Sequence, residues 1–241
     1  MATKSIPLFI SVYTVLACGI LIFLILNFFR KKSETIAIEK RRKVYIPIFL
    51  ILITLMIQSI LAFNGFFHNF ELPPRLLIGV LPVLAILLIS GFSFEVFQIL
   101  REFGSHRLVF FQVWRFLPEV LILLLIREGL LSEIMSIRGQ NFDLLVPASA
   151  PILYLAIRRN AISGNWIILW NGISIAVLSL TVFTGVMSAP FPFQFFHTNP
   201  SNEIMTLFPV SYLPLFMVPL AFSSHILGIA IGWSEWKQRK N

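Results

Sequence analysis

Cysteine and histidine are scarce in this sequence. Cys18 is the only cysteine among 241 residues, so an internal disulfide and a cysteine-rich zinc or iron–sulfur site are excluded. Of the four histidines, His225 alone falls inside a long apolar run, and a haem held by two intramembrane histidines is therefore not expected. No lysine lies within the apolar runs, so a retinal Schiff base has no attachment point.

Motifs that carry catalytic chemistry are also missing. The sequence contains no H-E-x-x-H, no G-x-S-x-G, no glycine-rich phosphate loop and no pair of aspartates within the apolar runs. These absences favour a protein that is not an enzyme, without excluding one. They also give no reason to expect a cofactor or a metal ion.

Charge is rare and apolar residues dominate. Only 12% of the residues are charged, 57% are hydrophobic, and the mean hydropathy is +0.87. This composition is typical of an integral membrane protein. We predict one all-α transmembrane bundle over residues 1–241, with no separate soluble domain.

Seven apolar segments are long enough, or nearly so, to cross a hydrocarbon core of about 30 Å as helices. The predicted spans are Pro7–Phe29, Val44–Phe63, Leu76–Leu100, Leu108–Ile126, Leu144–Ile157, Trp166–Met187 and Leu207–Ile231. The fifth contains two prolines and reaches only about 21 Å at helical rise. It must therefore extend into its flanks or be broken and shielded by its neighbours.

Basic residues sort to one side of the membrane if there are seven spans with the N-terminus outside. The cytoplasmic segments then hold fourteen: Arg30, Lys31, Lys32, Lys40, Arg41, Arg42, Lys43, Arg101, Arg107, Arg158, Arg159, Lys237, Arg239 and Lys240. The outer segments hold Lys4, Arg75, Arg127 and Arg138, and Arg115 completes the nineteen. This bias predicts an N-out, C-in orientation.

The net charge of +8 does not indicate a nucleic-acid partner, because the basic residues are spread over short loops at helix ends. We interpret them as topology determinants that contact anionic lipid at the cytoplasmic surface.

Arg115 and Glu119 are the most informative residues, since charges inside hydrocarbon are costly and usually have a purpose. With Gln112 they follow the i, i+3, i+7 spacing of a single helix face. Counted along straight helices, Glu95, Arg115, Asn171 and His225 lie about 8–10 Å from the cytoplasmic ends and Glu119 about 17 Å. We therefore predict a polar layer and, within it, a Glu95–Arg115–Glu119 triad.

An aspartate, several prolines and a phenylalanine-rich segment are each expected to have a structural role. Asp143 opens the fifth segment, where it is expected to be an N-cap. Proline recurs at positions 209, 214 and 219 of the last segment and at position 118, and such residues bend helices, open cavities or act as hinges. The segment Ser188–Thr206 is predicted to lie on the outer interface, where its phenylalanines enter the lipid: Phe191, Phe193, Phe195 and Phe196. The alternative is a lid over an outer vestibule.

Several of these patterns resemble a group of uncharacterised bacterial seven-helix inner-membrane proteins. The similarity rests on Gln112-x-x-Arg115, Asp143 with Pro147, Trp170-Asn171-Gly172, and the proline-rich last segment with His225. It covers the C-terminal two-thirds of the chain. The resemblance implies an inner-membrane location and no particular activity.

Two hypotheses for function follow. In the first, the protein is a small proton-coupled or small-solute transporter or channel, and its binding or ion-pathway residues are Glu95, Gln112, Arg115, Glu119, Asn171 and His225. In the second, it is a non-catalytic membrane scaffold or sensor in which the same side chains only fix helix packing.

Overall fold

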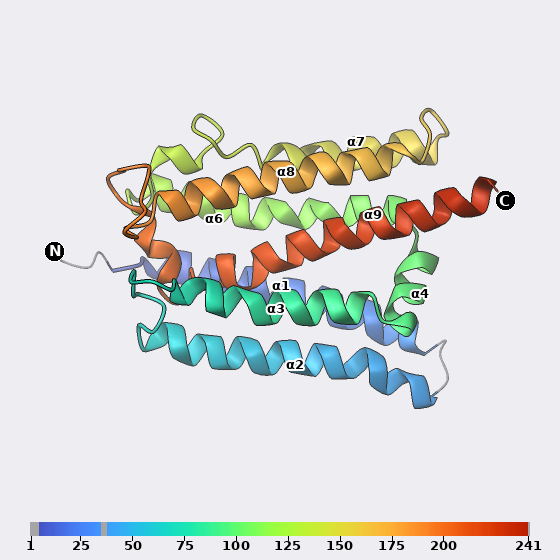
Figure 1. Cartoon of the computed structure of the whole chain (residues 1–241), viewed down its shortest axis with the longest axis horizontal. Coiled ribbons are helices and arrows are strands. Elements are labelled where there is room, and N and C mark those ends of the chain that lie inside the picture. The colour runs from blue at the N-terminus through green and yellow to red at the C-terminus, as the bar shows by residue number, and fades with distance from the viewer. Residues whose placement is uncertain (1–4, 35–37, 241) are drawn as a thin grey trace.

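The computed structural model describes residues 5–34 and 38–240, and over these residues the protein is a helical bundle without strands (Figure 1). The helices are α1 (Leu8–Ser33), α2 (Ile38–Phe63), α3 (Arg75–Gly91), α4 (Phe94–Phe103), α5 (Ser105–Phe111), α6 (Phe116–Arg127), α7 (Leu145–Arg158), α8 (Trp166–Met187) and α9 (Val218–Lys240). Short turns add η1 (Gln112–Arg115), η2 (Glu133–Met135), η3 (Asn202–Thr206) and the π-helical η4 (Leu213–Met217).

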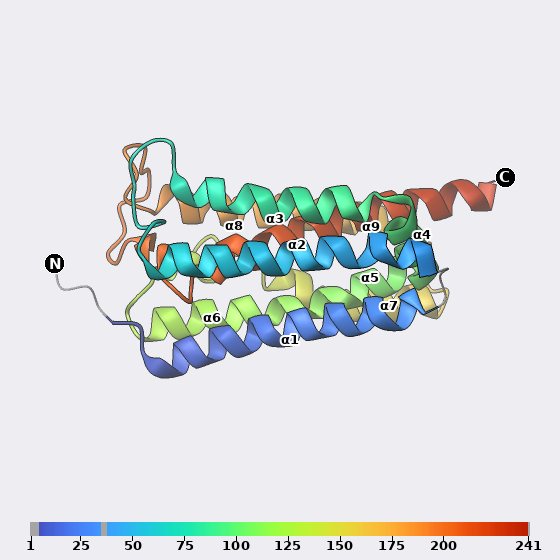
Figure 2. The same ribbon diagram turned by 90° about the horizontal axis from the view of Figure 1, so that it is seen from below.

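The long helices run side by side along one axis, and the two termini lie at opposite ends of the bundle (Figures 1 and 2). Helix α9 contacts both α8 and α3, so it occupies a central position. Helix α4 differs from the others, since it lies across one end (Figure 1).

Five described helical stretches are long and apolar enough to cross a membrane: 8–33, 40–63, 105–127, 166–187 and 213–238. A sixth candidate is α3 followed by α4, which bends by 77°. Helix α7, at the predicted fifth span, has only 14 residues and is too short to cross alone. The prediction of an all-α bundle is thus confirmed for the described residues, and its long apolar helices are compatible with membrane insertion, whereas seven full-length candidate spans are not found among these residues.

The predicted third span, Leu76–Leu100, is wrong as one straight helix. Helix α3 ends at Gly91, and Ser93 begins α4 in a new direction. A Cβ atom at position 91 would lie 2.5 Å from Cδ1 of Leu227, so any larger residue there would require the Leu227 side chain on α9 to move. The break changes the position of every residue after Gly91, including Glu95.

The predicted fourth and seventh spans contain proline-associated irregularities. In the fourth, the 3₁₀ turn η1 separates α5 from α6, and Pro118 has no N–H to donate to the carbonyl of Trp114, four residues earlier. In the seventh, the chain forms turns after Leu207, and the π-helix η4 includes Pro214. Pro209 and Pro214 lie in these irregular segments, whereas Pro118 and Pro219 lie in the first turns of α6 and α9.

One end of the bundle collects most of the basic side chains, and we call it the basic end. It contains the α1–α2 connection, α4, the α7–α8 connection and the C-terminus, and the opposite end, the loop end, contains segments 64–74 and 188–212 (Figure 1). The basic end therefore holds the residues that were predicted to be cytoplasmic. Lys4 lies outside the described residues, and nothing is described of the Arg239 side chain.

Candidate functional site

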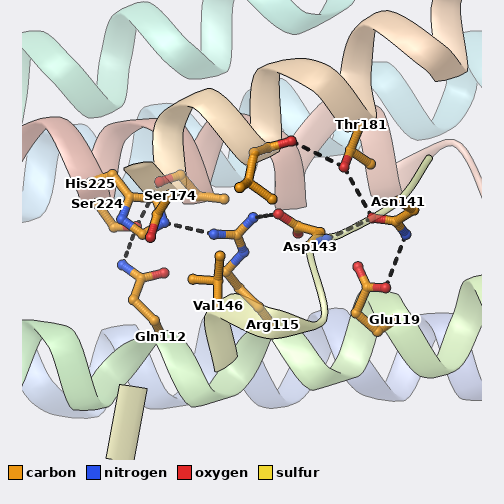
Figure 3. Close-up of polar contacts among 12 residues, drawn as sticks. Gln112, Arg115, Glu119, Asn141, Asp143, Val146, Ser174, Thr181, Ser224 and His225 are labelled. Atoms are coloured by element: carbon orange, nitrogen blue, oxygen red, sulfur yellow. Dashed lines mark hydrogen bonds and ion pairs between the residues drawn. The ribbon is translucent and has the colours of Figure 1, made fainter. Parts of the chain in front are cut away.

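Arg115 is the centre of a buried polar network inside the bundle (Figure 3). Its side chain is only 1% exposed, and its guanidinium donates through Nη2 to Oδ1 of Asp143, which is also buried. Asp143 lies in the segment that precedes α7, 28 residues further along the chain. A buried charge is tolerated when it is paired and hydrogen-bonded, and Arg115 meets this condition.

His225 continues the network from Arg115 to α8. Nη1 of Arg115 lies 2.7 Å from Nε2 of His225, and Nδ1 of His225 lies 2.8 Å from Oδ1 of Asn171. Asn171 in turn donates through Nδ2 to the carbonyl of Ile167. Because a guanidinium can only donate, Nε2 of His225 must accept and Nδ1 must carry the proton. The geometry thus requires a neutral His225.

Glu119 belongs to the same network on its other side. Asn141 donates through Nδ2 to Oε2 of Glu119 over 3.0 Å, and the Oδ1 atom of Asn141 accepts from Thr181 and from the backbone N–H of Asp143. Asn141 therefore connects the two acids, Glu119 and Asp143. Since Arg115 pairs with Asp143, Glu119 is the carboxyl group in the network without a basic partner.

Gln112 lies next to this network on η1. It donates through Nε2 to Oγ of Ser224, which precedes His225 on α9, over 2.8 Å. Its own Oε1 is buried and has no hydrogen-bond partner. The contact therefore adds a second polar link between η1 and α9.

The segment between α6 and α7 brings Asn141 and Asp143 into the bundle although it is not a regular helix. Its backbone hydrogen bonds are largely internal: Gln140 N–H donates to the carbonyl of Ile134, and Asn141 N–H to that of Ser136. Non-helical chain at membrane depth is tolerated only where protein shields it and its polar groups are satisfied. The buried side chains of Asn141 and Asp143 meet the first of these conditions.

The predicted triad is wrong, because among the described residues Arg115 forms an ion pair with Asp143 and with neither Glu95 nor Glu119. Glu95 accepts from Nζ of Lys43 at 2.8 Å, and it lies on α4, which turns away from the bundle axis. Asp143 takes the place of Glu95 at Arg115, so its predicted N-cap role is also wrong; Leu144 occupies the N-cap position of α7, with no side-chain cap hydrogen bond. Of the predicted site residues, the structure joins Arg115, Glu119, Asn171 and His225, with Gln112 adjacent.

Asn141 and Asp143 are the network residues that the sequence prediction missed. Asp143 is the only aspartate in the chain, but an aspartate just before a helix is usually an N-cap, so the sequence carries no clear signal of its contact with Arg115.

A cavity of about 200 Å³ adjoins the network in the half of the bundle nearer the loop end. Arg115, Glu119 and Asp143 contribute to one wall, while apolar residues of α3, α8, η4 and α9 form most of the lining. We call it the loop-end cavity. Two of its lining residues, Trp114 and Asn202, each have a buried polar atom without a partner, Nε1 and Oδ1 respectively.

A second cavity, of about 310 Å³, lies in the half nearer the basic end, and we call it the basic-end cavity. Its lining comes from the corresponding ends of α1, α2 and α3 together with α4, α5 and α9, and it includes Ser223 and Ser224. Ser224 is the residue to which Gln112 donates. The two cavities therefore reach neighbouring parts of α9.

The segment 188–206 covers the loop-end cavity rather than only lying at the surface. Ala189, Phe191 and Asn202 line the cavity, and Phe191 is buried, whereas Phe195 is 71% exposed. The prediction that all four phenylalanines of this segment face lipid is therefore wrong for Phe191. The position of the segment agrees with the alternative, a cover over a vestibule.

Residues 73–231 match a family model described as a domain of unknown function, DUF8737. The match covers well over half of the chain. The chain belongs to this family. The DUF8737 match begins just before α3 and ends within α9, so it includes every residue of the polar network. No curated protein and no solved structure matches the chain.

Proposed function

We propose that the protein crosses a bacterial inner membrane seven times, with its N-terminus outside and its C-terminus in the cytoplasm. Termini at opposite ends of the bundle support an odd number of crossings (Figure 1). In this proposal the short helix α7 and the segment that carries Asp143 make the fifth crossing together. The concentration of Lys and Arg at one end supports placing that end in the cytoplasm.

The basic end is proposed to contact anionic lipid headgroups. Lys237 lies over the ring of Trp233 and Lys240 over that of Trp236, with its ammonium 4.3 Å from the ring centroid. Aromatic rings next to ammonium groups suit the interface between lipid tails and headgroups.

Within this topology, the protein is proposed to transport a proton or a small solute. The supporting observation is the pair of cavities in opposite halves of the bundle, with the polar contacts Gln112–Ser224 and Arg115–His225 beside them. A pathway that is closed between two cavities is what alternating access requires. The irregular segments η1 and η4 flank the same region, where small backbone changes can open it.

Glu119 is proposed to be the proton-binding group. Asp143 is committed to Arg115, whereas Glu119 accepts from the neutral amide of Asn141 and borders the loop-end cavity. A proton on Glu119 changes the charge next to the cavity without breaking the Arg115 pair. An intramembrane carboxyl group at a cavity is typical of a proton-coupled pathway.

The test is a flux measurement in vesicles that contain the purified protein. With a pH-sensitive dye inside, Glu119→Gln should abolish pH-driven flux, whereas Glu95→Gln, at the surface pair with Lys43, should leave it intact. If the wild-type protein shows measurable flux and the Glu119→Gln variant shows the same flux, Glu119 is not the proton-binding group.

A scaffold or sensor is the second candidate. It is favoured by the fact that polar groups of the network form their hydrogen bonds with one another. Arg115, Asp143, His225 and Asn171 satisfy one another and are buried. If packing is their only role, replacing Arg115 and Asp143 together by leucine should alter thermal stability without affecting the activity of any partner complex. The vesicle assay should then detect no proton flux with the wild-type protein.

A further inference from the structure

Several side chains that line the loop-end cavity are partly exposed, and we call this part of the lining its edge. The edge includes Leu77 of α3, which is 45% exposed, and Val182 and Val186 of α8. Partly exposed Val218 and Phe222 of α9 also belong to the lining. All of these side chains are apolar. A molecule that enters at this edge therefore arrives from a hydrocarbon environment rather than from water.

The interior of the cavity also favours an apolar body. Its lining includes Val80 and Leu84 on one side, Leu178 on another, and Met217 between them. Cavities lined in this way stay dry and take up apolar ligands. A fully hydrated solute would lose its water here without compensation.

Asn202 identifies the polar group that such a ligand would carry. Its side chain is 6% exposed and lines the cavity, and its Nδ2 donates to the carbonyl of Gly185 over 2.7 Å. This bond fixes the amide, and Oδ1 remains buried without a partner. A buried acceptor without a donor is costly, and a ligand hydroxyl would satisfy it.

The charge around the cavity selects against acidic ligands. Glu119 and Asp143 both contribute to the wall, and the one guanidinium there is already bonded to Asp143 and His225. A carboxylate or phosphate would bring a further negative charge, and the unpartnered donor in the lining, Nε1–H of Trp114, carries no charge to offset it. A neutral hydroxyl adds no charge and supplies the donor that Asn202 lacks.

We propose that the loop-end cavity binds a lipid-soluble alcohol, which enters sideways from the membrane between α3 and α8 and donates its hydroxyl to Asn202. This inference rests on the proposed function only in taking the cavity as the place where a transported molecule is held. The binding test below uses no gradient, so its result is independent of the flux measurement.

Trp114 provides the reporter, because it lines the cavity and is 7% exposed. In a protein whose other four tryptophans are replaced by phenylalanine, 12-bromododecanol in detergent should quench Trp114 fluorescence saturably. Bromododecanoic acid and bromododecylamine should quench at least tenfold more weakly. Replacing Asn202 by leucine should lower the binding affinity for the alcohol by about three- to tenfold, which is the effect expected for the loss of one hydrogen bond.

Two matched variants on α8 distinguish loss of the binding cavity from a general folding defect. Val182→Phe fills the edge of the cavity and should remove saturable quenching, whereas Leu180→Phe, at a residue that is 40% exposed and absent from the lining, should retain it. Quenching that is unsaturable, or equal in these two variants, shows partitioning into the micelle only and overturns the proposal. Tighter binding of the amine or the acid overturns the choice of a hydroxyl. If the alcohol binds as expected while Glu119→Gln leaves flux unchanged, the cavity assignment stands and the proton role fails.

Discussion

The guanidinium of Arg115 and the carboxylate of Asp143 form a buried ion pair between a 3₁₀ turn and a segment that is not a regular helix. Each side chain is the other's charged partner, and His225 supplies the additional contact to Arg115. The pair therefore ties the segment before α7 to the centre of the bundle.

Removing one member of this pair should destabilise the protein strongly. Asp143→Asn leaves Arg115 buried without a counter-charge, and the expected cost is about 3–5 kcal/mol. Replacing Arg115 and Asp143 together by leucine should cost clearly less than the sum of Arg115→Leu and Asp143→Leu. Denaturant unfolding in detergent measures the wild type and these four variants, and additive effects of the two single leucine substitutions would contradict a direct pair.

Two glycines on neighbouring helices should respond differently to alanine. At Gly228 a Cβ atom would lie 2.9 Å from Oδ1 of Asn171, the atom that His225 contacts. Gly228→Ala should therefore lower stability by about 1–3 kcal/mol through the displaced amide. At Gly172 a Cβ meets no atom within 4 Å, so Gly172→Ala should be neutral or slightly stabilising. The melting temperatures of the two variants, measured in the same detergent, provide the comparison.

The Lys43–Glu95 pair should contribute little to stability. Although Glu95 itself is 6% exposed, the Lys43 side chain is 63% exposed, and exposed ion pairs contribute about 1 kcal/mol or less. Glu95→Gln should therefore change the free energy of unfolding by no more than about 1 kcal/mol. A loss as large as that of Asp143→Asn would support the triad that the sequence suggested and count against the observed pairing.

The proposed orientation can be tested by labelling single cysteines on intact cells. Cys18 is buried, and Cys18→Ala provides a background without thiols. In that background Arg138→Cys, at an exposed position on the proposed outer side, should react with a membrane-impermeant maleimide. Arg159→Cys, also exposed, should react only after the cells are permeabilised. The reverse pattern would invert the topology.

The helical bundle with its long apolar helices could be predicted from composition and from the length of the apolar runs, because each run needs only local information. The position of Glu95 could not, since it depends on the 77° bend after Gly91, and that bend accompanies close packing against Leu227, far along the chain. Depth counted along a straight helix becomes meaningless beyond such a break.

The partner of Arg115 was missed for a related reason. Asp143 lies before a helix, where a carboxylate usually caps the first turn. Its actual role depends on the preceding segment entering the bundle, which follows from tertiary contacts such as those of Asn141 with Glu119 and Thr181. By contrast, counting along the helices placed Arg115 and His225 at a similar depth, and in the structure the two side chains are hydrogen-bonded.

The order of the chain has a consequence for biogenesis. Arg115 is synthesised 28 residues before Asp143 and 110 residues before His225. An arginine at the centre of an isolated inserting helix costs about 2.5–3.5 kcal/mol on insertion scales. During synthesis, Arg115 therefore has no counter-ion until the chain has been extended by 28 residues to Asp143, and the buried pair cannot form before the segment between α6 and α7 is in place.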